Sequence, residues 1–179
     1  MFFDDLKESA KQLKQVKAIT GAAVLAALDV VLGMFTIRLT TTLEISFSFL
    51  AKASIGVMYG PVIAALCGGV TDIIKYFLNP SGGFMVLFTL IEVTSGFLYG
   101  AMLYKRKITF WCCLGAKTVV SVICTLMLTP LVLHVMYGTS VWVLLFARLP
   151  KNLLLLLPES IAMYFVVSQV VKIKEKLNR

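Results

Sequence analysis

The stretch "GVMYGPVIAAL" (56–66) decides how this chain folds. It lies inside a long apolar region that could form either one long helix or two shorter ones. Proline lacks an amide hydrogen and disfavours the helical conformation for the residue before it. Gly60-Pro61 therefore predicts two helices joined by a tight turn.

The composition around this stretch is that of a membrane protein. The chain has 179 residues, of which 59% are hydrophobic and 15% charged, with a mean hydropathy of +0.92. A soluble domain is nearer half apolar and a quarter charged. Several apolar stretches approach the roughly 20 residues that a helix needs to cross a bilayer. We therefore expect a multi-pass integral membrane protein with almost no extramembrane part.

Hydropathy and helix-breaking residues predict an all-α bundle of six transmembrane helices in one domain covering 1–179. The predicted spans lie near 17–37, 44–59, 61–78, 84–104, 109–135 and 141–171. The opening "MFFDDLKESAKQLKQ" (1–15) lacks the features of a secretory signal and is expected to remain as an amphipathic helix at the interface.

The distribution of basic residues supports six spans rather than five. Most lysines and arginines form three clusters that border apolar segments: Lys7, Lys11, Lys14 and Lys17; Lys105, Arg106 and Lys107; Lys172, Lys174, Lys176 and Arg179. Basic residues favour the cytoplasmic side, and only an even number of spans puts all three clusters there. Both termini are therefore expected to be cytoplasmic. The formal charge of +8 needs no nucleic-acid partner to explain it.

The predicted outer loops 38–46, 79–83 and 134–140 contain Thr, Ser, Asn, Pro and Gly, and could fold over a ligand. A complete secondary transporter is usually about twice this size and built from two related halves. The chain is thus expected to be one part of a larger machine, or a homo-oligomer.

The last predicted span carries charges in "RLPKNLLLLLPES" (148–160). A charge at the bilayer centre costs about 2.5–3.5 kcal/mol on insertion scales. At about 100° per residue, Arg148, Lys151, Asn152 and Glu159 share one face of the helix. Such a polar face must meet the protein interior or a water-filled cavity. Two cations and an amide facing an outward cavity suit a solute that bears a carboxylate.

A structural role is the alternative for charges in the spans. Lysines and arginines can pair with acids inside the bundle, or extend along apolar surface to the interface. For Lys52, Lys75 and Lys117 this interpretation has at least as much weight as a ligand role.

Small residues four positions apart let membrane helices approach closely. Ala22 and Ala26, with Ala23 and Ala27, form such a ridge on the first span, which is either a partner-docking face or a site of internal packing. "GVMYG" (56–60) and "GFLYG" (96–100) have the same spacing, and internal packing is expected for both.

Catalytic and metal-binding patterns are not found in the sequence. His134 has no ligand partner at metal-site spacing, and "GAKT" (115–118) lacks the adjacent Gly-Lys of a phosphate-binding loop. No catalytic residue, metal or cofactor is predicted.

The order of several short motifs resembles the substrate-binding S components of energy-coupling-factor (ECF) vitamin transporters, and within them the folate-type branch. The motifs are "SFSFL" (46–50), Gly60-Pro61, Asp72, "NPSG" (79–82), "FTL" (88–90), Tyr99-Gly100 and "RLPKN" (148–152). Two positions depart from the folate-type pattern: Ala51 stands where a proline is expected, and Val86-Leu87 where Pro-Gly is expected.

The resemblance implies a transporter subunit of the bacterial plasma membrane with no ATPase site of its own. Such a subunit binds a vitamin, here expected to be folate, from outside with high affinity. It then docks through its alanine face onto a transmembrane coupling subunit, which two cytoplasmic ATPases drive. The residues expected to contact the ligand are Arg38, Ser46, Phe47, Ser48, Asn79, Arg148, Lys151 and Asn152.

Three alternatives remain at this point. The chain could be an S component for another vitamin, or a structural or assembly subunit. It could also be a small membrane enzyme acting on lipid or isoprenoid substrates, although its candidate acids, Asp29, Asp72, Glu92 and Glu159, are dispersed over four spans.

Overall fold

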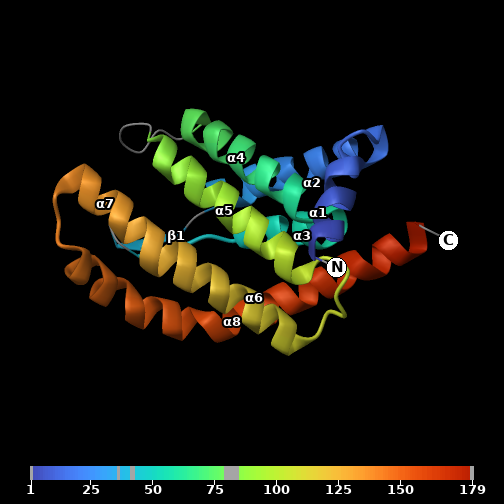
Figure 1. Ribbon diagram of the computed structural model, residues 1–179. Coiled ribbons are helices and arrows are strands. Elements are labelled where there is room, and N and C mark those ends of the chain that lie inside the picture. Colours follow the sequence, from blue (N-terminus) through green and yellow to red (C-terminus); the bar gives the residue numbers. More distant parts are fainter. Residues whose placement is uncertain (1, 36, 41–42, 79–84, 178–179) are drawn as a thin grey trace.

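The computed structural model describes residues 2–35, 37–40, 43–78 and 85–177, most of which are helical (Figure 1). In chain order the elements are α1 (Phe2–Gln12), α2 (Val16–Met34), β1 (Ile37–Thr40), β2 (Leu43–Ile45), α3 (Ser48–Tyr59), α4 (Pro61–Leu78), α5 (Val86–Leu103), α6 (Phe110–Val120), the π-helix η1 (Ser121–Leu128), α7 (Thr129–Tyr137) and α8 (Val141–Leu177).

Within the described residues, five helical segments are long and apolar enough to cross a membrane. They are Val16–Met34, Pro61–Leu78, Val86–Leu103, Phe110–Tyr137 and Val141–Lys174. The predicted span 44–59 differs, because α3 begins only at Ser48 and has 12 residues. At 1.5 Å per residue it covers about 18 Å, well short of the bilayer core.

The loop predicted at 38–46 contains a short antiparallel ribbon of β1 and β2, in which Arg38 pairs with Glu44 and Ile37 with Ile45. The all-α prediction therefore holds for the bundle but not for this loop. Helical periodicity and hydropathy did not indicate the ribbon.

The two ends of the bundle differ in what they carry. Both chain termini lie near one end, which we call the terminal end, together with the loop between α5 and α6 (Figure 1). The turn between α7 and α8 lies at the opposite end, and β1 lies toward that side (Figure 1). We call this end the ribbon end.

The chain breaks at Gly60-Pro61, as predicted. Gly60 adopts a φ of 87° that favours glycine, and its amide closes α3 by donating to the carbonyl of Gly56 (3.0 Å). Ser9 of α1, which is fully buried, connects the two helix ends. Its hydroxyl donates to the carbonyl of Tyr59 (2.8 Å) and accepts from the amide of Val62 (3.2 Å).

Helix α1 is held against the terminal end by further polar contacts. The side chain of Gln12 donates to the Tyr104 hydroxyl (2.8 Å), and Glu8 pairs with Lys105. The hydrogen bond from Lys105 holds the pKa of the Glu8 carboxyl below its usual range.

Helices α4 and α5 pack closely because glycines face the partner backbone. A Cβ on Gly96 would overlap with the carbonyl oxygen of Ala64, and one on Gly68 would lie 2.6 Å from the carbonyl oxygen of Glu92. Gly56 of α3 faces the backbone of Gly100 in the same way. Glycines of both pairs expected to pack internally, 56–60 and 96–100, therefore do so.

The glycine contacts give a direct test of this packing. We expect Gly96→Ala to lower the apparent melting temperature in detergent by several degrees, because the added methyl group must displace backbone at a cost of about 1–3 kcal/mol. Gly115→Ala is the matched control, since a Cβ there meets nothing within 4 Å. Circular dichroism on both variants checks this, and equal melting temperatures would contradict it.

Candidate ligand-binding cavity

A polar cavity of about 500 Å³ is lined by residues of α2 to α8 and η1. Its lining includes five basic and two acidic side chains: Lys52, Lys75, Lys117, Arg148, Lys151, Glu92 and Glu159. Charges of one sign inside an apolar bundle are costly unless they serve a partner of opposite sign. The cavity is thus suited to an anionic solute.

The predicted polar face of α8, between residues 148 and 159, lines this cavity. Arg148, Lys151, Asn152 and Glu159 all contribute to the wall. The amide of Asn152 donates to the carbonyl of Arg148 (3.0 Å) and accepts from the Ser121 hydroxyl (3.2 Å). Helix α8 continues through Pro150 and Pro158, so the four side chains stay on one helix.

Three lysines of the lining form ion pairs within the bundle. Lys52 pairs with Glu92, and the Nζ–Oε2 distance between Lys117 and Glu159 is 2.9 Å. These pairs agree with the structural interpretation of the three lysines, but all three side chains also line the cavity.

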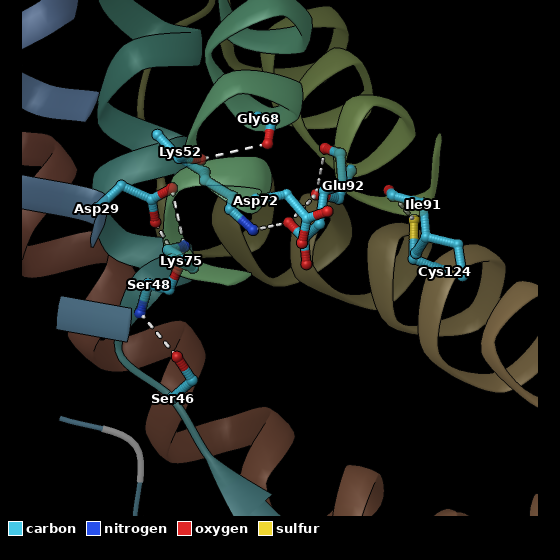
Figure 2. A network of polar contacts seen from close by, with 12 residues as sticks. Asp29, Ser46, Ser48, Lys52, Gly68, Asp72, Lys75, Ile91, Glu92 and Cys124 are labelled. Atoms are coloured by element: carbon cyan, nitrogen blue, oxygen red, sulfur yellow. Dashed lines mark hydrogen bonds and ion pairs between the residues drawn. The ribbon is translucent and has the colours of Figure 1, made fainter. Parts of the chain in front are cut away.

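The third lysine pair connects α4 to α2 and α3 (Figure 2). Lys75 lies 3.0 Å from Asp29 Oδ2 and donates to the Ser48 hydroxyl (2.6 Å), which in turn donates to Asp29. Asp29 is fully buried. The site predictions did not include Asp29. The sequence signal for its role was a single acid within an apolar span.

Aromatic rings form the less polar part of the wall. Phe49 and Tyr99 both line the cavity, and Lys117 Nζ lies 3.8 Å from the centroid of the Phe49 ring. Phe47, the aromatic residue predicted to contact the ligand, is 39% exposed and is not part of the lining. Phe47 precedes the first residue of α3, whereas Phe49 lies in its first turn.

The other predicted contacts divide into two groups. Ser46 and Ser48 line the cavity, and the amide of Ser48 donates to the Ser46 hydroxyl (3.3 Å). Asn79 and the side chain of Arg38 lie outside the described residues.

The π-helix η1 also contributes to the wall, with Ser121, Cys124 and Thr125. π-helical turns are frequent at functional sites. Thr129 closes the last turn by donating its hydroxyl to the carbonyl of Cys124 (2.7 Å), and Pro130 follows. Pro130 within a predicted span was the only sequence signal for this irregularity.

A second concave surface, which we call the alanine groove, lies on α2 and α4 and has a volume of about 540 Å³. Ala22, Ala23, Ala26 and Ala27 all line it, with Ile63, Leu66 and Val70 among the residues opposite. The groove is almost wholly apolar and contains no charged side chain among its lining residues.

A family model for the substrate-specific component of ECF transporters matches residues 17–167. The chain belongs to this family. This S component is therefore the substrate-binding subunit of a transporter and a multi-pass membrane protein, in agreement with its five apolar helices.

Individual relatives extend the comparison. The S component is 27% identical over 152 residues to the folate transporter FolT of Clostridium novyi, covering 85% of this chain and 88% of the relative. It is 28% identical over 127 residues to FolT of Streptococcus mutans, covering 67% and 68%. A crystal structure of FolT bound with folic acid superposes with a TM-score of 0.79 at 32% identity, covering 86% of this chain and 94% of that one.

The Asp29 cluster gives a stability prediction. Asp29→Ala leaves the Lys75 ammonium without its carboxylate, and breaking a buried pair in this way costs about 3 kcal/mol or more. The double variant Asp29→Ala/Lys75→Met removes both charges, so we expect it to be more stable than the single variant. Chemical unfolding of the purified protein measures both, and a double variant less stable than Asp29→Ala would contradict the assignment.

Proposed function

We propose that this S component binds folate from the outer side of the membrane and delivers it inward. The observation that carries the proposal is a cavity lined by Arg148, Lys151 and three lysines that also contains two aromatic rings. A folate has a flat, hydrogen-bonding pteridine at one end and a glutamate with two carboxylates at the other. The FolT relatives and the FolT structure with folic acid support the same ligand.

Arg148 and Lys151 are proposed to bind the ligand carboxylates, because they lie one turn apart near the ribbon end of α8. An arginine can hold a carboxylate through two parallel hydrogen bonds. Asn152, Ser46 and Ser48 are proposed to complete the polar contacts. Arg38, Phe47 and Asn79, which the sequence puts in or beside the predicted outer loops, are also proposed as ligand contacts.

The proposed topology is one domain over residues 1–179 with six membrane segments. The terminal end faces the cytoplasm, because the three basic clusters border the segments there. The ribbon end faces outward and admits the ligand. The 12-residue α3 would cross only part of the bilayer, with the ribbon filling the remaining depth.

The alanine groove is the proposed docking surface for the coupling subunit of an ECF module, which two cytoplasmic ATPases energise. Small side chains leave room for a partner helix to approach closely. Ala23 and Ala27 are exposed on α2, so a partner can reach them. The S component itself is proposed to have no enzymatic activity.

The ligand proposal is tested with Arg148→Ala/Lys151→Ala in purified, full-length protein. We expect the affinity for folic acid to fall by well over tenfold, because two charge-assisted contacts are lost. The control is Lys172→Ala/Lys176→Ala, which removes two exposed lysines from the terminal end of the same helix. Titration calorimetry with folic acid and with other vitamins measures the effect, and unchanged folic-acid affinity in the first variant would refute the assignment.

The docking proposal is tested with Ala23→Phe/Ala27→Phe. We expect folic-acid binding by the purified variant to stay within about twofold of wild type, since neither residue lines the polar cavity. Folate uptake by cells that also express an ECF module should fall to background, because the new side chains fill the alanine groove. Val24→Phe, at an exposed position outside the groove lining, is the control. Normal uptake by the double variant would overturn the docking site.

A further inference from the structure

We propose that α1 binds the headgroups of anionic phospholipids at the terminal end, through a face formed by Lys7, Lys11 and Lys14. We call this surface the lysine face. None of the three lysines is among the described lining residues of the polar cavity or the alanine groove. The lipid contacts therefore do not depend on the ligand or the docking partner proposed above.

One side of α1 is already bound to the bundle. Ser9 is fully buried, and its hydroxyl contacts both the end of α3 and the start of α4. Gln12, about 60° from Ser9 around the helix, donates to the Tyr104 hydroxyl (2.8 Å). Leu13, just after the helix, packs against the apolar cluster that contains Ile63. Because protein covers this side, α1 cannot insert it into the hydrocarbon of the bilayer.

The opposite side of α1 is cationic and open. At about 100° per residue, Lys7 and Lys11 each lie about 160° from Ser9, one on either side of the point opposite to it. The amide of Lys14 donates to the carbonyl of Lys11 (3.1 Å), so the chain makes one further turn after the helix. All three lysines are exposed. Within the described part of the chain, no ion pair involves any of them.

The acids of α1 leave this positive charge in excess. Asp5 is half-buried on the side that packs against the bundle. Glu8 pairs with Lys105 of the loop between α5 and α6. Asp4 is exposed one turn before Lys7, and one acid against three lysines leaves the face with a net positive charge.

The neighbours of α1 indicate the depth at which it lies. Helix α2 begins at Val16, which is 78% exposed and only two residues after Lys14. Trp111, near the start of α6, is 74% exposed. In membrane proteins tryptophan is enriched where the hydrocarbon meets the headgroups. Since Glu8 holds α1 to Lys105, shortly before Trp111, the lysine face lies at the level of the headgroups.

The chemistry of the face selects anionic lipids. Lysine ammoniums donate charge-assisted hydrogen bonds to phosphate oxygens. A zwitterionic headgroup adds a cation that opposes this attraction, whereas phosphatidylglycerol keeps a net negative charge. Each lysine near an anionic membrane surface strengthens binding about fivefold. Headgroups that hold α1 also hold the joint between α3 and α4, because Ser9 connects α1 to both helix ends.

Hydrogen–deuterium exchange of purified full-length protein tests the proposal in two kinds of lipid nanodisc, one of phosphatidylcholine alone and one that also contains phosphatidylglycerol. The amides of α1 exchange when the helix opens from the bundle. In the anionic discs, opening also separates the lysines from phosphates. We expect the peptide covering residues 2–14 to exchange at least about fivefold more slowly in these discs at low salt. This difference should shrink at high salt.

The variant Lys7→Gln/Lys11→Gln should lose most of the difference between the two discs. In phosphatidylcholine discs it should exchange like wild type, because these side chains contribute no ion pair to the described fold. The matched control, Lys172→Gln/Lys176→Gln, removes an equally spaced pair of exposed lysines from α8 and should keep the protection of α1. Lys7→Arg/Lys11→Arg retains the charge and should keep it as well.

Equal exchange of α1 in the two discs would overturn the proposal, and the wild-type protein alone decides this even if a variant does not fold. That result is also the one expected if the lysine face binds an acidic protein surface instead of lipid. Protection that persists in Lys7→Gln/Lys11→Gln would contradict the assignment to these lysines. An equal loss of protection in the α8 control would contradict it too, because the effect would then follow total charge.

Discussion

The cost of placing charge in an apolar bundle determines most of this structure. Lys52, Lys75 and Lys117 each meet a carboxylate from another helix, so every pair joins two elements. A charge removed from water needs a partner in good geometry, or its burial destabilises the protein by several kcal/mol. The pairs thus fix the relative positions of α2, α3, α4, α5, α6 and α8 around the cavity, whose lining also includes Arg148 and Lys151.

Helix α2 takes part in both concave surfaces of the molecule. Its alanines line the apolar groove, while Asp29, two residues after Ala27, contacts Ser48 and Lys75 beside the polar cavity. One helix therefore presents a smooth face to the outside and a charged group to the inside. Helix α2 can take both roles because its alanines lie on one face and its single acid, Asp29, lies on another.

Much of the bundle could be predicted because hydropathy and proline act locally. The helix break at Gly60-Pro61 follows from the geometry of proline, and the polar face of α8 follows from helical periodicity across residues 148–159. The ribbon of β1 and β2 and the late start of α3 could not be predicted, since both depend on contacts between distant segments. For the same reason the sequence did not indicate that Phe49 lines the cavity.

The partners of the charged residues also lay beyond the sequence. Asp29, Glu92 and Glu159 come from three helices, and only the packing of the bundle decides which lysine each one meets. Local patterns therefore predicted that the cavity would be polar and cationic, but not which groups would form its deeper wall.

The cations of the lining have a consequence for how the ligand is held. Mobile ions screen the attraction between fixed positive charges and a doubly negative nutrient. Its retention should accordingly weaken as the salt concentration of the medium rises.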